Sequence, residues 1–120
     1  MNFQMTGGGE VKPFLLHDYF RNLVNRFFKI LPIRESEEAS LQTYMQSLKI
    51  ELVGMQGLIP DIGCGSIYLQ LLSILQYLID NPDCSLRIVR REVFNAISAC
   101  NKLKAMCADY YAAQECGVAE

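Results

Sequence analysis

The fold is decided by the stretch SIYLQLLSILQYLID, which runs from Ser66 to Asp80. Between its ends, the polar residues form only a narrow stripe of Gln70, Ser73 and Gln76. A helix that is apolar nearly all round must be buried nearly all round. We therefore expect this stretch to be a helix that lies centrally in the molecule or that also forms an interface with another chain.

Two segments before this stretch repeat apolar residues every three or four positions, which is the spacing of one helical face. The first segment covers residues 13–31 and ends at Pro32, because the residue before a proline resists helical geometry. The second covers residues 36–56, with Ser36 as its expected N-terminal cap. The expected core positions of these segments are Leu16, Phe20, Leu23, Phe27, Ile30, Leu41, Met45, Leu48, Leu52 and Met55.

A further helix is expected over residues 83–113, with Pro82 beside its first turn. Its expected core positions are Val89, Val93, Ala96, Cys100, Leu103, Cys107 and Tyr110. No run of alternating apolar and polar residues is long enough for a sheet. Because short connections favour antiparallel neighbours, the sequence predicts an all-α, four-helix antiparallel bundle with helices at 13–31, 36–56, 66–80 and 83–113.

Composition points to one packed domain, since 51% of the 120 residues are hydrophobic and 20% are charged. We expect this domain over residues 11–116, with a flexible N-terminal tail at 1–10 and a frayed C-terminus at 117–120. The net charge of −2 gives no overall positive field that would attract nucleic acid or an anionic membrane. The longest nearly apolar run, residues 67–79, would rise only about 20 Å as a helix, so no membrane span is expected.

Cysteine and histidine usage favours neither disulfides nor a metal site. The five cysteines are odd in number and include no Cys-x-x-Cys pair, and His17 is the only histidine. A zinc site would need three or four convergent ligands. The sequence therefore predicts reduced thiols, a cytoplasmic location and no metal.

The stretch IPDIGCGS, residues 59–66, resembles the D-x-G-x-G-x-G loop that holds S-adenosylmethionine in methyltransferases. That loop requires a buried strand before it and a helix after it. Here Pro60 stands where the strand should pair, and the third glycine is absent. We therefore expect an interhelix loop that binds no cofactor, in which Gly63 and Gly65 supply unusual backbone angles and Ser66 caps the next helix.

No catalytic set is expected from the sequence. His17 and Asp18 are neighbours on a helix, so their side chains point apart and do not form a base with its orienting acid. Cys64 in the glycine-containing loop is interpreted as a passive thiol. The sequence therefore predicts a protein that is not an enzyme.

The leading hypothesis is a non-enzymatic bundle of the adaptor, immunity or accessory type that binds other proteins and forms a homodimer. If the core cannot bury every aromatic side chain, the remainder marks the interface. The candidate interface residues are Phe14, Tyr19, Phe28, Tyr68 and Tyr77.

Two alternatives belong to other classes. The first is a nucleic-acid-associated protein that uses a basic face of Arg87, Arg90 and Arg91. Neither interleaved aromatic residues nor helix-turn-helix spacing supports this face, so nucleic acid is the less favoured partner. The second alternative is a binder of small molecules with a cavity inside the bundle.

Overall fold

The computed structural model describes residues 3–37 and 39–119, with side chains up to residue 107. The protein is mostly helical (78%), which confirms the predicted all-α class. In chain order the elements are β1 (Phe3–Gln4), β2 (Glu10–Val11), α1 (Pro13–Phe28), α2 (Ile30–Glu35), α3 (Leu41–Leu58), α4 (Pro60–Gly63), α5 (Ser66–Asp80) and α6 (Leu86–Ala119). The predicted set of four helices is incomplete, because the chain also forms two short helices, α2 and α4, and a hairpin of β1 and β2.

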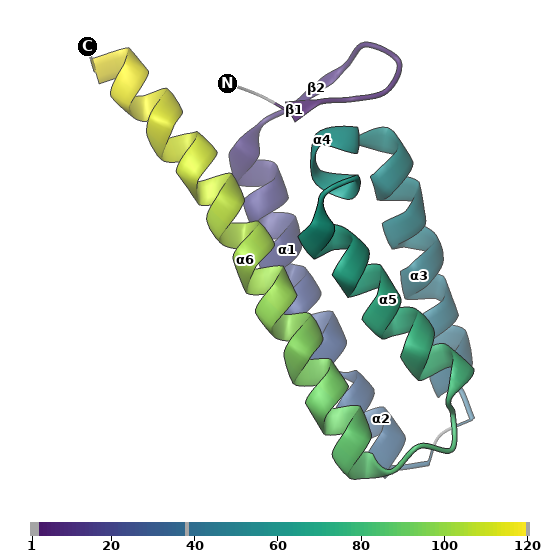
Figure 1. Ribbon diagram of the computed structural model, residues 1–120. Coiled ribbons are helices and arrows are strands. Elements are labelled where there is room, and N and C mark those ends of the chain that lie inside the picture. The colour runs from purple at the N-terminus through teal and green to yellow at the C-terminus, as the bar shows by residue number, and fades with distance from the viewer. Residues whose placement is uncertain (1–2, 38, 120) are drawn as a thin grey trace.

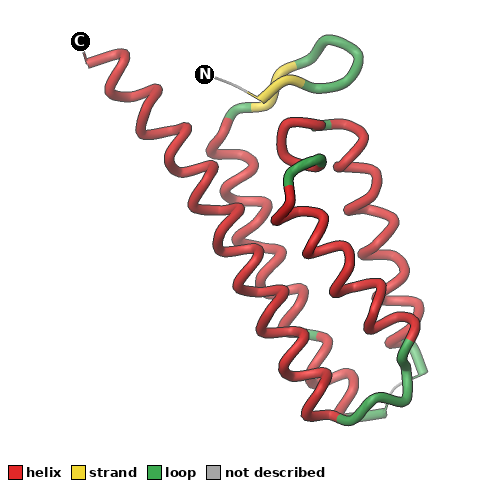
Figure 2. The backbone as a smooth tube through the Cα atoms, in the orientation of Figure 1, coloured by secondary structure: helices red, strands yellow, loops and turns green. Residues whose placement is uncertain are grey.

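The long helices lie side by side, with α1 along α6, α6 along α5, and α5 along α3 (Figure 1). Neighbours in this order run in opposite directions, and each connection lies at one end of the molecule (Figure 2). The short helix α2 extends α1 at one end, whereas α4 and the hairpin lie at the other end (Figure 1).

The core is built from the apolar positions that recur at helical spacing. Every core position predicted for residues 13–31 is buried, and so are those of α6 as far as Cys107. Leu41 and Met55, at the two ends of the predicted seam of α3, are only partly buried. Among the described residues no polar or charged residue is fully buried, so packing of apolar side chains carries the fold.

Helix α5 has the predicted bounds of 66–80, but it is not buried all round. Leu69 is 46% exposed and Tyr77 is 38% exposed. The excess of apolar residues in this helix therefore becomes surface in the single chain.

The first helix ends before the predicted boundary, and Pro32 does not stop the chain from being helical. Helix α1 ends at Phe28, and α2 begins again at Ile30. Pro32 therefore lies in the first turn of α2, where its missing N–H breaks no intrahelical hydrogen bond.

The second predicted boundary is also displaced. Helix α3 begins at Leu41 rather than near residue 36, and Ser36 ends α2 instead of capping α3. Glu37 adopts φ of 53°, the left-handed geometry that commonly follows a helix. The chain needs these extra residues to turn from α2 into α3.

The last helix begins at Leu86 rather than at residue 83. The hydroxyl of Ser85 accepts a hydrogen bond from the Ile88 N–H, 3.3 Å away, and Pro82 lies in the preceding turn. The backbone of α6 stays helical to Ala119, beyond the predicted end at 113 and through most of the predicted frayed segment 117–120. The predicted core position Tyr110 lies outside the residues whose side chains are described.

Residues 1–10, expected as a flexible tail, include most of an antiparallel hairpin. Phe3 is paired with Val11 and is only 2% exposed. Gly7 and Gly8 have φ of 96° and 99°, which suits the chain reversal between the strands. Burial of one aromatic side chain, together with a glycine turn, is the reason that this segment is ordered against the bundle.

The stretch 59–66 has no strand on either side of Asp61 within the described residues. Helix α3 ends at Leu58, and Pro60–Gly63 forms the short helix α4. Gly63 and Gly65 do not adopt positive φ, and no side-chain cap is made at the start of α5, where Gly65 precedes Ser66. The predicted interhelix connection is therefore present, but its glycines are not needed for unusual backbone angles.

Candidate functional site

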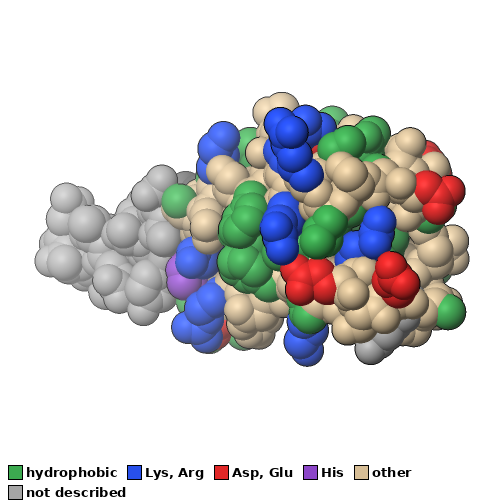
Figure 3. All heavy atoms as spheres, turned by 90° about the horizontal axis from the view of Figure 1, so that it is seen from below, with side chains coloured by type: hydrophobic (Ala, Val, Ile, Leu, Met, Phe, Trp, Pro, Cys, Tyr) green, Lys and Arg blue, Asp and Glu red, His purple; other side chains and the backbone are tan. Residues whose placement is uncertain are grey.

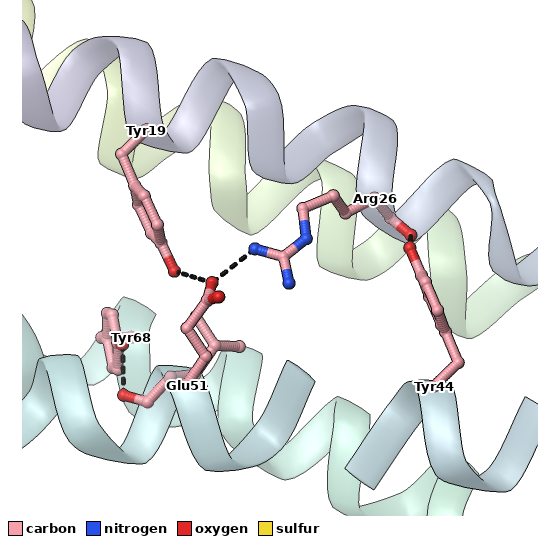
Figure 4. Close-up of polar contacts among 6 residues, drawn as sticks. Tyr19, Arg26, Tyr44, Glu51 and Tyr68 are labelled. Atoms are coloured by element: carbon pink, nitrogen blue, oxygen red, sulfur yellow. Dashed lines mark hydrogen bonds and ion pairs between the residues drawn. The ribbon is translucent and has the colours of Figure 1, made fainter. Parts of the chain in front are cut away.

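A cluster of polar side chains joins α1 to α3. In the described part of the chain, the backbones of these two helices come close at few positions. The Tyr19 hydroxyl donates a hydrogen bond of 2.6 Å to Glu51 Oε2, and Arg26 forms an ion pair with the same oxygen. The Tyr44 hydroxyl donates to the Arg26 backbone carbonyl over 2.8 Å. Figure 4 shows Tyr19 and Arg26 reaching from α1 to the Glu51 carboxylate of α3.

The protonation states in this cluster are fixed near neutral pH. The hydrogen bond from Arg26 holds the pKa of Glu51 below its usual range. Burial raises the pKa of Tyr19 well above its ordinary value, and the hydrogen bond to Glu51 raises it further. The side chains of Tyr19, Arg26 and Glu51 therefore join α1 to α3 through a charged, hydrogen-bonded contact, here called the clamp.

Of the clamp residues, only Tyr19 is singled out by the sequence, as a candidate interface residue. Tyr19 and Arg26 are seven residues apart, so they lie on the same side of a helix. Glu51 is polar and directly precedes the seam residue Leu52. The sequence therefore shows that Tyr19 and Arg26 share a side of one helix. That Glu51 is their partner depends on how α3 is placed against α1.

The predicted interface residues are distributed over several surfaces. Phe14 is 45% and Phe28 is 42% exposed, and the ring of Phe28 contacts that of Phe94 edge-on at 5.9 Å between centroids. Tyr68 lies in the core instead, where its hydroxyl donates a 2.5 Å hydrogen bond to the Leu52 carbonyl. Tyr68 is therefore a core residue whose one polar atom is satisfied.

The most exposed large apolar side chain among the described residues lies on α3. Ile50 is 74% exposed, and Val53, one turn further along the helix, is 46% exposed. Both line a groove between α3 and α5, here called the α3–α5 groove, whose volume is about 570 Å³. The α3–α5 groove is lined by Gln46, Lys49, Ile50, Val53, Gln76, Ile79 and Asp80.

The predicted basic face is partly neutralised. Arg90 pairs with Glu35 and Arg91 pairs with Glu92, each at 3.1 Å, while Arg87 is exposed. Figure 3 shows Lys and Arg side chains at this end of the molecule interspersed with acidic and hydrophobic ones. Two of the three arginines of this face are thus engaged in ion pairs at the surface.

The described thiols fall into an exposed and a buried group. Cys64 is exposed and Cys84 is half-buried, whereas Cys100 and Cys107 are buried, and all four are free. Burial raises the pKa of Cys100 to about 12 and that of Cys107 to about 11. The buried thiols therefore stay protonated and act as small apolar core residues.

His17 Nδ1 and Asp18 Oδ1 lie 3.8 Å apart, so the expectation that these side chains point away from each other is wrong, and Asp18 Oδ1 makes a shorter contact of 3.1 Å with Arg21. Within residues 3–37 and 39–107, no group of three or more His, Cys, Asp or Glu side chains is arranged to hold a metal ion. The described helices include none with both the length and the apolar character needed to cross a bilayer.

Comparison with known proteins found no matching family model, no matching curated protein and no matching solved structure.

Proposed function

We propose that this chain is a cytoplasmic, non-enzymatic interaction protein that binds a protein partner through the α3–α5 groove. The observation that carries this proposal is the 74% exposure of Ile50 beside Val53. Scattered apolar residues on a surface are ordinary, but apolar residues that line a concave strip between two helices are typical of a docking surface. The four cysteines whose side chains are described are all free, which agrees with a reducing compartment.

A second copy of the chain is the partner that the chemistry of the α3–α5 groove favours. Lys49 and Asp80 line the same groove and carry opposite charges. In a two-fold symmetric dimer, the same surface patch of both copies meets, so Lys49 of one copy can face Asp80 of the other. The apolar strip of Ile50 and Val53 would then be covered in both copies at once.

Self-association is tested by sedimentation equilibrium over a range of protein concentrations. Ile50→Lys should weaken the dimer at least about tenfold, because it buries an unpaired charge in the interface. Asn101→Lys is the matched control, since Asn101 is exposed on α6 and does not line the groove. This control should leave the association constant unchanged.

Charge reversal tests the proposed pairing separately. Lys49→Glu or Asp80→Lys alone should weaken association by like-charge repulsion, and the double variant should restore it. If the unaltered chain stays monomeric at high concentration, the homodimer is refuted. If it dimerises but the double variant does not recover, the interface lies elsewhere on the surface.

A further inference from the structure

Two aromatic side chains meet on the surface where α1 packs along α6. Phe28 is the last residue of α1, and its ring contacts the ring of Phe94 on α6 edge-on. Phe94 is 52% exposed, and Phe28 is nearly as open to water. The two rings form one apolar patch, here called the Phe28–Phe94 ridge, which lies on a different pair of helices from the α3–α5 groove. Neighbouring apolar side chains that stay open to water are typical of an interaction surface.

Cations border this ridge. Arg87 lies two helical turns before Phe94 and Arg91 lies one turn before it, so both are on the same side of α6 as the ring. Lys29 directly follows Phe28. Within the described part of the chain, neither Arg87 nor Lys29 forms an ion pair. The surroundings of the ridge are therefore positive, although the whole chain carries a net charge of −2.

The ion pairs near the ridge leave their arginines available to a partner. Arg90 pairs with Glu35 and Arg91 pairs with Glu92, and all three of Arg90, Arg91 and Glu35 are exposed. Exposed ion pairs contribute little to stability, because water screens the charges and competes for them. Carboxylates of a partner can therefore replace these contacts at little cost.

We propose that the Phe28–Phe94 ridge binds an acidic amphipathic helix of a partner protein. Apolar residues at positions i, i+4 and i+7 of that helix would cover Phe28 and Phe94, as in other complexes in which a helix lies on an apolar surface. Its Asp and Glu residues would face Arg87, Arg91 and Lys29, which supply charge-assisted hydrogen bonds.

The contact between the two rings favours a helix over single-stranded nucleic acid. A base binds by stacking on an open aromatic face. In the ridge, the two rings lie at 85° to each other, so the edge of one ring is directed at the face of the other. Aliphatic side chains pack against such a ridge from any direction, and they need no open ring face.

The test is a fluorescence anisotropy titration of the full chain with a fluorescein-labelled helical peptide. The peptide carries Leu at positions i, i+4 and i+7, and Glu and Ala elsewhere. It should bind saturably, and a second peptide with Lys in place of Glu should bind at least about tenfold more weakly. A third peptide with Gln in place of Leu should also bind at least about tenfold more weakly. Labelled dodecathymidylate should bind more weakly than the acidic peptide.

Variants then assign binding to the ridge. Phe94→Ala and Arg87→Glu should each weaken binding of the acidic peptide at least about fivefold. Leu69→Ala, an exposed truncation on α5, and Lys12→Glu, an exposed charge reversal before α1, are the matched controls and should leave the affinity unchanged. Because Phe94 is exposed, its truncation leaves the core intact.

Four results would overturn the proposal: no binding of the acidic peptide, equal binding of the lysine peptide, tighter binding of dodecathymidylate, or unchanged affinity in a folded Phe94→Ala chain. Ile50→Lys should bind the acidic peptide as the unaltered chain does, since Ile50 lies in the α3–α5 groove. Self-association is read separately by sedimentation, so failure at one surface is distinguishable from failure at the other.

Discussion

Gly63 is the residue whose missing side chain allows α4 to fold back against the end of α3. A Cβ built at this position would lie 2.4 Å from Gln56 Cα and 2.7 Å from the Gln56 carbonyl oxygen. Both are backbone atoms, so neither can move aside alone. The Gln56 side chain adds a 2.9 Å hydrogen bond to the Gly63 carbonyl, which fixes the same contact.

The Gly63→Ala substitution should therefore destabilise the protein by about 1–3 kcal/mol, the usual cost of overpacking. The matched control is Gly54→Ala in α3, where an added Cβ meets nothing within 4 Å. That change should stabilise the protein by about 0.5–1 kcal/mol, because alanine favours a helix interior. Urea unfolding of both variants measures the difference, and equal effects would contradict the close approach at Gly63.

The N-terminal hairpin is an element that packs on the rest of the molecule through few residues. The Thr6 backbone N–H donates to the Leu58 carbonyl over 2.7 Å, and its hydroxyl donates to the Gly57 carbonyl over 2.6 Å. These bonds satisfy carbonyls at the end of α3 that have no partner within the helix. Phe3 supplies the apolar part of the same contact.

We expect Phe3→Ala to destabilise the protein by about 3 kcal/mol, as is usual for truncating a buried phenylalanine. Gln4→Ala, next in the strand and exposed, should change the stability by less than about 0.5 kcal/mol. Thermal unfolding monitored by circular dichroism gives both values. A negligible effect of Phe3→Ala would mean that the hairpin is detached from the bundle in solution.

The clamp between α1 and α3 is the second contact between elements that can be tested directly. Tyr19→Phe and Glu51→Ala should each cost about 1 kcal/mol, a modest value because the carboxylate is partly screened by water. The double variant should cost about 0.5 kcal/mol less than the sum of the two, since both remove the same hydrogen bond. Asp18→Asn, which breaks an exposed pair on α1, is the control and should have almost no effect. Strict additivity would show that the two side chains do not interact.

At the scale of the whole molecule, buried thiols and phenols make stability depend on alkaline pH. Desolvation raises the pKa of Cys100 from about 9 to about 12 and that of Cys107 from about 9 to about 11. It also raises the pKa of Tyr68. Above about pH 9 the unfolded chain therefore releases protons that the folded chain retains, so ionisation favours unfolding.

The free energy of unfolding should consequently be level near neutral pH and should fall as the pH rises above about 9. Replacing Cys100 by alanine should make this decline less steep, because one of the raised pKa values is removed. On the acid side, Glu51 should contribute stability that is lost as the pH falls below about 4.5, since its pKa is lowered in the fold. Urea titrations at several pH values measure both limbs, and a level profile up to pH 11 would place the thiols in water.

The helical class and the bounds of α5 followed from the sequence alone. Apolar residues at spacings of three and four must share one helical face, and this local geometry does not depend on the rest of the molecule. The same reasoning identified the core positions of α1, and those of α6 as far as Cys107. It failed at the ends of helices, because Pro32 suits a first helical turn as well as a stop, and Ser36 suits a helix end as well as a cap.

Only the tertiary structure decided the contacts between segments far apart in sequence. Phe3 becomes core because α4 packs against its strand. Glu51 becomes the partner of Tyr19 and Arg26 because α3 faces α1. Arg34 reaches the Cys84 carbonyl because α2 lies beside the α5–α6 connection. The exposed apolar residues Ile50 and Val53 belong to an apolar-rich segment of the sequence, but the groove that they line depends on the relative rotation of α3 and α5. Periodicity fixes which face of a helix is apolar, whereas side-chain packing between helices fixes what that face meets.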